Sequence, residues 1–180
     1  MDQIAVLRYA KALFEISVEK NQLDEYNQAA KDILAVLNSD KDFAAIVNHR
    51  AISASDKMAT MQTIFEGKVP EDFIGLFSLI FKRGRQRELA GVLARFEDLY
   101  KEHKRIAVAK IYSAQPLDDA KKAEIAAVLA KKLEKTIELE VMIDPTLIAG
   151  FKAEVDGYVF DASTKNQISK LTKQLMTAAK

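Results

Sequence analysis

Cysteine and tryptophan are both absent from this chain. Without a thiol there is no disulfide, no zinc–thiolate site and no cysteine nucleophile. Histidine occurs only at His49 and His103, which do not form a two-histidine metal motif. We expect each histidine to be a surface or loop residue rather than a catalytic base. These absences remove most of the side chains on which metal-dependent and nucleophilic catalysis rely.

The chain also lacks the commoner signatures of nucleotide chemistry. No glycine-rich phosphate loop followed by lysine and serine or threonine occurs, so we expect no nucleotide to bind by that route. The adjacent carboxylates Asp118 and Asp119 indicate a helix cap rather than an acid/base pair. The sequence therefore predicts a protein with no active site of its own, no metal and no cofactor.

Neither sign of charge is in excess. Lys and Arg number 27, Asp and Glu number 26, and the net charge is +1. A general nucleic-acid binder needs a basic surplus, so this class is disfavoured. No run approaches the roughly 20 apolar residues of a membrane span. The first residues resemble neither a signal nor a transit peptide, and the absence of cysteine suits a cytosolic protein without requiring one.

Residues 1–105 show the periodicity of several helices, separated by residues that typically begin or end a helix. Ser53 followed by Asp56 predicts a capped helix start, and Gly67 predicts the end of the same helix. Pro70, followed by two acids, suits the first turn of another helix. The predicted helices cover approximately residues 4–20, 22–38, 43–48, 53–67, 70–84 and 86–104.

After Arg105 the pattern changes. Residues 106–112 and 137–143 are typical of strands, and the stretch between them predicts a helix that Asp118 or Asp119 caps. Residues 151–155 and 158–160 flank Asp-Gly, a strong hairpin signal. Ser163 predicts the cap of a last amphipathic helix with Ile168, Leu171, Leu175 and Met176 on one face. The expected fold is mainly α: a six-helix bundle over 1–105, then a small α/β domain over 106–180.

Two of the predicted helices, 4–20 and 70–84, are apolar around most of their circumference. A surface helix usually carries a narrower apolar stripe. Either both helices are buried on all sides, or each has one side in the bundle and another lining an apolar groove for a partner helix. Periodicity alone leaves both interpretations open, because it reports burial and not what covers the residue.

Two phrases at opposite ends of the chain resemble one family. The first is RYAKALF at residues 8–14, and a separate stretch in the middle of the chain, LFSLIFKRGR at 76–85, resembles the same family. The second runs from IDPTLIAG at 143–150 through Asp-Gly at 156–157 to DAS at 161–163. At this spacing they resemble the delta subunit of bacterial ATP synthase, the relative of the mitochondrial oligomycin-sensitivity-conferring protein. The chain departs from the family pattern at Ala149, at Ala162 and over 164–167.

The resemblance implies a function and partners. In this family the first and fifth helices of the bundle form a groove for the amino-terminal helix of an alpha subunit of the catalytic head. It implies groove residues on these two helices: Tyr9, Leu13, Leu76, Leu79 and Ile80. The α/β domain is implied to contact the peripheral-stalk b subunits. The expected role is a non-catalytic stator connector that couples proton transport to ATP synthesis, peripheral to the cytoplasmic face of the bacterial membrane.

The carboxy-terminal motif is expected to be structural. Pro145 cannot donate a ladder hydrogen bond, and Gly150 and Gly157 permit backbone conformations that cost other residues more. The side chains of Asp161 and Ser163 suit turns and helix starts. The predicted turn motif comprises Asp144, Pro145, Gly150, Gly157, Asp161 and Ser163.

Three other functions remain open from the residues alone. The segment 82–87 holds four cations, so a nucleic-acid-binding helical regulator is the leading alternative, although cations also suit a helix carboxyl terminus. A small hydrolase would need convergent titratable groups, and no such set is evident. An unrelated helical adaptor would share the groove but not the partner.

Overall fold

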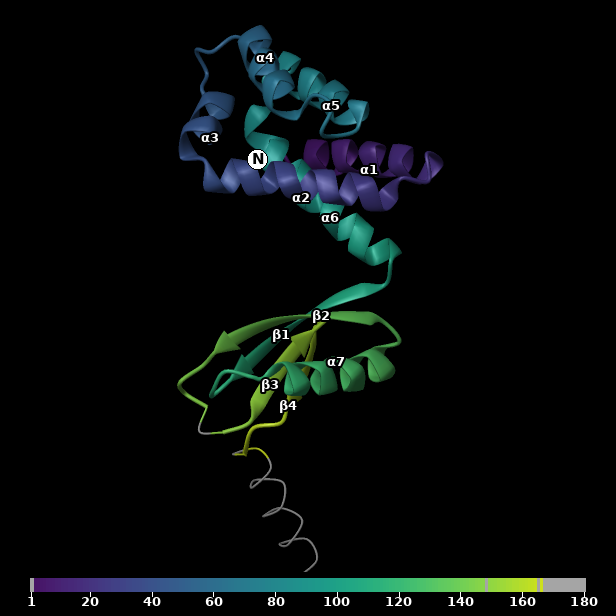
Figure 1. The fold of residues 1–180 in the computed structure, drawn as a ribbon, viewed down its shortest axis with the longest axis vertical. Coiled ribbons are helices and arrows are strands. Elements are labelled where there is room, and N and C mark those ends of the chain that lie inside the picture. The colour runs from purple at the N-terminus through teal and green to yellow at the C-terminus, as the bar shows by residue number, and fades with distance from the viewer. Residues whose placement is uncertain (1, 148, 165, 167–180) are drawn as a thin grey trace, which may run out of the picture. The chain divides into compact units, whose positions relative to one another are not determined.

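The computed structural model describes residues 2–147, 149–164 and 166. The chain divides into two compact units, Met1–His103 and Lys104–Lys180, each described here by itself (Figure 1). The sequence placed the change of pattern near residue 105. No helix among the described residues has the length and apolar character needed to cross a membrane.

Unit 1 is helical, as predicted. The helices are α1 (Gln3–Glu19), α2 (Leu23–Ser39), α3 (Lys41–Asn48), α4 (Ala54–Phe65), α5 (Glu71–Lys82) and α6 (Leu89–His103), with a 3-10 turn, η1 (Gln86–Glu88), before α6. These six helices confirm the bundle expected from periodicity. The turn η1 was predicted as the beginning of the sixth helix.

Side-chain caps set several of these helix starts. The Ser53 hydroxyl accepts a hydrogen bond from the Asp56 backbone N–H at 3.1 Å, which is the predicted cap of α4. Asp40 caps α3 in the same way. Pro70 is the residue before the first turn of α5 and not its first helical residue, because the helix begins at Glu71. A proline there still costs no hydrogen bond, since the first amides of a helix have no intrahelical acceptor.

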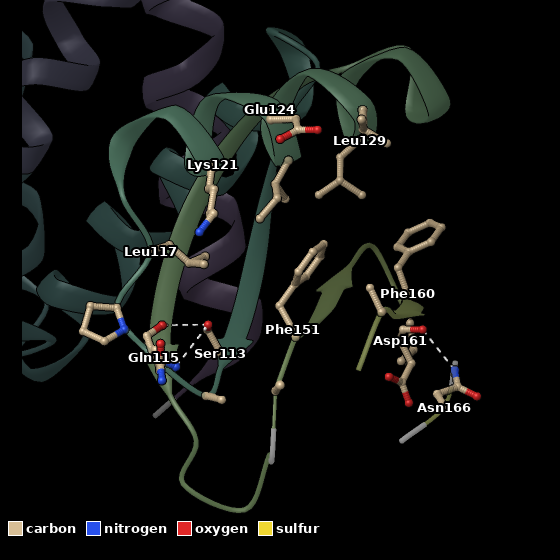
Figure 2. A pocket seen from close by; sticks show the side chains of 18 of the residues that line it. Ser113, Gln115, Leu117, Lys121, Glu124, Leu129, Phe151, Phe160, Asp161 and Asn166 are labelled. Atoms are coloured by element: carbon tan, nitrogen blue, oxygen red, sulfur yellow. Dashed lines mark hydrogen bonds between the residues drawn. The ribbon is translucent and has the colours of Figure 1, made fainter. Parts of the chain in front are cut away.

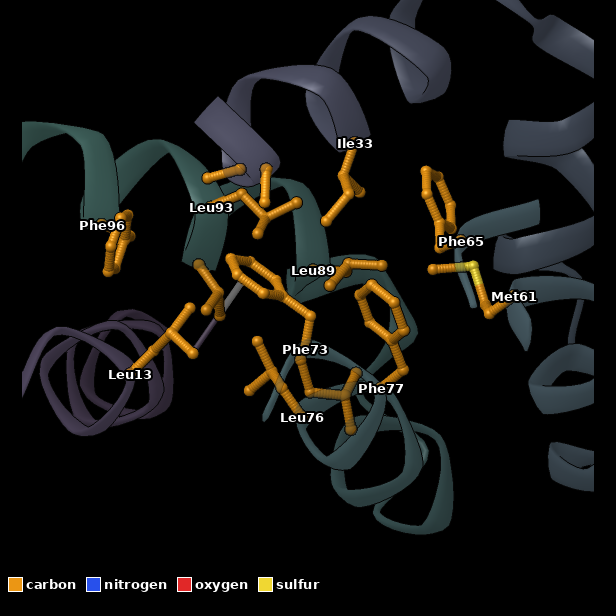
Figure 3. Close-up of a cluster of buried hydrophobic side chains, with 14 of the residues drawn as sticks. Leu13, Ile33, Met61, Phe65, Phe73, Leu76, Phe77, Leu89, Leu93 and Phe96 are labelled. Carbon is orange, nitrogen blue, oxygen red and sulfur yellow. The ribbon is translucent and has the colours of Figure 1, made fainter. Parts of the chain in front are cut away.

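The core of unit 1 is built around α6 and α5. Helix α6 packs against α1 and α2, while α5 packs against α4. Figure 3 shows Phe73 and Phe77 projecting from α5 into this core toward Leu89 and Leu93. All four side chains are fully buried or nearly so. Burial of such side chains is the main stabilising contribution to a bundle of short helices.

Unit 2 is a sheet with one described helix. Its elements are β1 (Ile106–Ser113), α7 (Asp119–Leu133), β2 (Thr136–Ile143), β3 (Phe151–Val155) and β4 (Tyr158–Asp161). The strand order is β2-β1-β3-β4. β1 and β2 are parallel and joined through α7, whereas β1–β3 and β3–β4 are antiparallel. This confirms the predicted small α/β unit.

Two local signals in unit 2 act as the sequence indicated. Asp118 caps α7 by accepting from the Lys121 backbone N–H at 2.7 Å. Asp156 and Gly157 both have positive φ, 49° and 79°, which gives the tight turn that a two-residue hairpin prefers. The predicted last helix falls mostly outside the described residues, and so do Ile168, Leu171, Leu175 and Met176.

Candidate functional site

Helices α1 and α5 lie side by side in opposite directions, joined by polar contacts at both ends. At the start of α1, the Asp2 carboxylate lies 3.2 Å from Arg85, which follows α5. At the end of α1, the Lys20 ammonium lies 2.6 Å from the Asp72 carboxylate in the first turn of α5. We call the strip between these two contacts the α1–α5 seam.

The contact at Asp72 involves three residues. The same carboxylate oxygen accepts hydrogen bonds from the Lys20 ammonium and from the hydroxyl of the buried Tyr26 on α2. The hydrogen bond from Lys20, followed by that from Tyr26, holds the pKa of Asp72 below its ordinary value. The pKa of Lys20 is raised by the same hydrogen bond, and the pKa of Tyr26 is raised first by burial and then by Asp72. This cluster ties α1, α2 and α5 together.

The other end of the seam uses part of the basic segment 82–87. Arg85 contacts Asp2, and it also lies 3.9 Å from a carboxylate oxygen of Glu88. The backbone N–H of Asp2 donates to Glu88 at 3.2 Å. Arg85 therefore has an internal structural role, which reduces the cationic surface on which a nucleic-acid interpretation would depend.

The five predicted groove residues differ in how deeply their side chains are buried. Leu13, Leu76 and Ile80 are buried and belong to the core of unit 1. Tyr9 is half-buried and packs against that core, while Leu79 is 42% exposed. The structure thus brings all five to the α1 and α5 side of the bundle. In this conformation only Tyr9 and Leu79 retain substantial accessible surface.

Helical spacing places Tyr9 on the flank of α1 that faces α5, and Leu79 on the flank of α5 that faces α1. Tyr9 and Lys20 are separated by about three turns of α1, so both lie on the flank that contacts α5. Leu79 and Asp72 are separated by about two turns and share the flank of α5 that contacts α1. Ile16, about two turns beyond Tyr9, is half-buried on the same flank. Sequence reasoning did not select Ile16, although its spacing from Tyr9 was a usable signal.

Helix α1 is not buried on all sides. Ile4 is 72% exposed, Leu7 is 46% exposed and Val18 is 38% exposed, and helical spacing places all three away from the seam. Helix α5 is more deeply buried, since five of its twelve residues belong to the core. The apolar circumference seen in the sequence therefore has two origins: core packing for α5, and core packing plus exposed apolar residues for α1.

The aspartates of the carboxy-terminal turn motif accept hydrogen bonds from nearby backbone amides and do not form a reactive cluster. The Asp144 carboxylate accepts from the Thr146 backbone N–H at 2.9 Å and from its hydroxyl at 2.7 Å, and these bonds lower the pKa of Asp144. The Asp161 carboxylate accepts from the Ser163 backbone N–H at 2.9 Å. Pro145 lies in the turn that follows β2.

Gly150 is the most constrained of the glycines in this motif. Its φ is +88°, and a β-carbon at this position would lie 2.5 Å from the carbonyl oxygen of Ala162. Gly157 has a φ of +79° but open space around it. Gly150 therefore allows the segment before β3 to lie against the segment after β4.

The two histidines occupy helix ends in unit 1. His49 follows α3, is exposed, and accepts a hydrogen bond from the Ala51 backbone N–H at 3.2 Å. His103 ends α6 and packs edge-on against Phe14 with ring centroids 5.6 Å apart. Across the described ranges, no cluster of three or more histidine, aspartate or glutamate side chains could hold a metal ion.

Unit 2 contains a cleft of about 860 Å³ between α7 and the β3–β4 hairpin. Figure 2 shows Phe151 and Phe160 projecting from the strands toward Leu129 of α7 across this cleft. Lys121 and Glu124 lie at its α7 side, while Asp161 and Asn166 lie at the opposite side. The lining is mainly apolar, which suits a packed side-chain layer better than a charged ligand.

Comparisons with known proteins match almost the whole chain to one family. The family model described as "ATP synthase delta (OSCP) subunit" matches residues 6–175. The ATP synthase subunit delta of Shouchella clausii is 33% identical over 171 residues, covering 94% of each chain. That of Clostridium kluyveri is 29% identical over 169 residues, covering 94% of this chain and 93% of the relative.

A solved structure shows the same fold. A chain in the cryo-EM structure of the Toxoplasma gondii mitochondrial ATP synthase hexamer superposes with a TM-score of 0.71 at 20% identity. The match covers 95% of this chain and 97% of that one. Near-full-length agreement in sequence and fold leaves one assignment: the chain belongs to the ATP synthase delta (OSCP) subunit family, and is a non-catalytic stator component of an F-type ATP synthase.

Proposed function

We propose that the α1–α5 seam of unit 1 binds the amino-terminal helix of an alpha subunit of the catalytic head. The proposal also assigns unit 2 to the peripheral-stalk b subunits, at the cytoplasmic face of a bacterial membrane. The chain reaches the membrane only through the complex. The observation that carries the proposal is the partial exposure of Tyr9 on α1 and Leu79 on α5, beside the buried core residues Leu13, Leu76 and Ile80.

The physical properties of the seam support a helix as the occupant. Leu13, Leu76 and Ile80 form a closely packed apolar base, and Tyr9 offers a large rigid side chain with a polar tip. An amphipathic helix can lay its apolar face along such a strip. Because polar contacts hold both ends of the seam, the two helices are fixed before the partner arrives, which reduces the entropic cost of binding.

The mechanism is coupling by rigid connection, with no bond chemistry in this subunit. A rotor that turns inside the head exerts torque on the head, and the head must be held for that torque to drive synthesis. On this proposal unit 1 holds the head and unit 2 holds the stalk. Losing the seam contact would leave the head able to hydrolyse ATP but uncoupled from proton transport.

The seam is tested by calorimetric titration of the full chain with a peptide of the alpha subunit's first 20 or so residues, long enough for a groove-filling helix. Leu79→Asp should weaken binding at least about 30-fold, because the loss of one buried apolar contact costs roughly 2 kcal/mol. Tyr9→Ala should weaken it to a similar degree. The same titration with the purified catalytic head checks that the peptide reports the physiological contact.

Leu7→Asp is the matched control. Leu7 is on α1 and 46% exposed, close to the 42% of Leu79, but it points away from the seam. Leu7→Asp should therefore leave the affinity for the peptide within about twofold of the wild type. Equal losses for Leu7→Asp and Leu79→Asp, or no loss for either seam variant, would reject the seam as the binding surface.

A further inference from the structure

Helix α5 contains a glycine that the packing of unit 1 does not require. Gly75 lies inside α5, is exposed, and does not have a positive φ, so other residues could adopt its backbone conformation. A β-carbon at this position would meet no atom within 4 Å. Glycine stabilises the middle of a helix less than alanine does, because it loses more backbone freedom on folding. Within the described part of unit 1, no contact accounts for a glycine here.

Helical spacing places Gly75 beside the α1–α5 seam. It comes three residues after Asp72 and four before Leu79, and residues at these separations share one side of a helix. Lys20 of α1 contacts Asp72, and Ile16 lies about one turn before Lys20 on the same side of α1. The two helices run in opposite directions. The turn of α1 that contains Ile16 therefore lies opposite the turn of α5 that contains Gly75.

The missing side chain leaves a notch whose borders are mainly apolar. The bare backbone of α5 forms its floor. Leu79, which is 42% exposed, borders it one turn further along α5, and the half-buried Ile16 borders it on the α1 side. The ion pair between Lys20 and Asp72 closes its other end. We call this feature the Gly75 notch.

A partner can reach α5 only from the side on which the notch lies. Phe73, Leu76 and Phe77 point inward from α5, as Figure 3 shows, and each is at most 8% exposed. The inward side of the helix is therefore filled by the core of unit 1. Gly75 and Leu79 are the exposed positions in the central turns of α5. A helix that binds the seam must pass over them.

One large apolar side chain from a partner helix suits this notch. Packed helices lie about 8–10 Å apart, and the side chains at the contact set the distance. A glycine on one helix lets the other approach closely, and a side chain from the other then enters as a knob enters a hole. A polar side chain would lose water against Ile16 and Leu79 without gaining a hydrogen bond from them.

We propose that the Gly75 notch takes one large apolar side chain, of about the size of leucine or phenylalanine, and thereby fixes the register of the helix that binds the seam. The inference rests on the proposed binding of an alpha-subunit helix to the seam, and it adds the position at which the two helices approach most closely. Gly75 is then a specificity-determining residue. It selects a partner helix with a large apolar residue at one position and a second apolar residue one turn away, beside Leu79.

Substitutions that fill the notch test the proposal by calorimetric titration of the full chain with the peptide of the alpha subunit's first 20 or so residues. Gly75→Ala adds a single methyl group and should weaken binding about fivefold. Gly75→Leu occupies the notch and should weaken binding at least about 30-fold, because the partner side chain then has no space. The denaturation midpoint of Gly75→Ala should nevertheless rise, since alanine favours the helix.

Ala59→Leu is the matched control. Ala59 is an exposed small residue in the middle of another helix of unit 1, α4, which does not form the seam. The substitution adds a leucine to a helix surface, as Gly75→Leu does. It should leave the affinity for the peptide within about twofold of the wild type. Equal losses for Ala59→Leu and Gly75→Leu would overturn the proposal.

A scan of the peptide identifies the side chain that enters the notch. Each large apolar residue of the peptide is replaced in turn by alanine and titrated against the wild type and Gly75→Leu. One replacement should weaken binding to the wild type at least about tenfold, yet bind Gly75→Leu at least as tightly as the unmodified peptide does. If every replacement weakened binding to both proteins by the same factor, no single side chain would be coupled to Gly75, and the proposal would be rejected.

The outcomes distinguish failure of the notch from failure of the proposed function. If Leu79→Asp weakened binding whereas Gly75→Leu bound the peptide within about twofold of the wild type, the seam would stand and the notch would be rejected. If neither the peptide nor the catalytic head bound the unmodified chain, the proposed function would fail, and the notch with it. Should Gly75→Leu unfold more readily than the wild type, Gly75→Ala decides: affinity equal to that of the wild type would overturn the proposal.

Discussion

The Lys20 ammonium lies 2.6 Å from the Asp72 carboxylate and joins two helices whose contacting residues are 52 positions apart. The Tyr26 hydroxyl donates to the same oxygen from a third helix. Tyr26 is fully buried, so its hydroxyl depends on this acceptor. One end of the α1–α5 seam therefore depends on the single carboxylate of Asp72, while Asp2 and Arg85 hold the other end.

Replacing that carboxylate should loosen the bundle. Asp72→Asn keeps the size of the side chain but removes the charge that both donors share, and we expect a loss of about 1–2 kcal/mol in the free energy of unfolding. The measurement is urea denaturation followed by circular dichroism. Glu15→Gln is the control, because Glu15 pairs with Lys11 at 3.9 Å on the exposed surface and should change stability by less than about 0.5 kcal/mol.

The same cluster should give unit 1 a defined response to acid. The pKa of Asp72 is depressed in the folded state, so its contribution is complete above its unfolded pKa and is lost as the pH falls through the folded value. Stability should therefore decline below a pH of about 4. Asp72→Asn should make that decline shallower, and urea midpoints measured across the acid range report it. An unchanged acid slope would show that other carboxylates are responsible.

Substitution of a core residue on α5 should destabilise unit 1 much more than substitution of a partly exposed seam residue on the same helix. Phe77 is fully buried, and Phe77→Ala should destabilise unit 1 by about 3–5 kcal/mol through lost burial and a cavity. Leu79→Ala, at a side chain 42% exposed, should cost less than about 1 kcal/mol. Thermal unfolding measures both variants. If Leu79→Ala destabilised as strongly as Phe77→Ala, Leu79 would be a core residue and its place in the seam would be lost.

Two glycine substitutions should act in opposite directions. Gly150→Ala places a methyl group 2.5 Å from the Ala162 carbonyl oxygen at a φ of +88°, so unit 2 should lose about 2 kcal/mol or more. Gly75 lies within α5 with no atom near its would-be β-carbon, and Gly75→Ala should stabilise unit 1 by about 0.5–1 kcal/mol. Denaturant midpoints for both variants check the prediction, and destabilisation by Gly75→Ala would contradict it.

Much of the fold could be predicted because its signals are local. Ser53 with Asp56, Asp118 before α7, and Asp156 with Gly157 each act within a few residues, and each occurs in the structure as a cap or a turn. The change from helical to strand periodicity near residue 105 likewise needs no knowledge of distant partners. A last helix was predicted from the same kind of signal, over residues that lie mostly outside the described part of the chain.

The depth of each seam residue could not be predicted in this way. Tyr9, Leu13, Leu76, Leu79 and Ile80 are all apolar or aromatic at helical spacing, and the sequence treats them alike. The structure buries Leu13, Leu76 and Ile80 but leaves surface on Tyr9 and Leu79. Periodicity selects a face of one helix, whereas exposure depends on which other helices lie beside that face.

The amino-acid sequence by itself determined the helix and strand types, their caps and turns, and the family resemblance, because each depends on neighbouring residues or on motif spacing. Only the tertiary structure decided that Asp72 serves three helices, that Arg85 pairs with Asp2, and that Gly150 lies against Ala162. It also decided that the β3–β4 half of one sheet face borders an apolar cleft. These are contacts between residues far apart in the chain, so they depend on how the helices and strands pack and not on neighbouring residues.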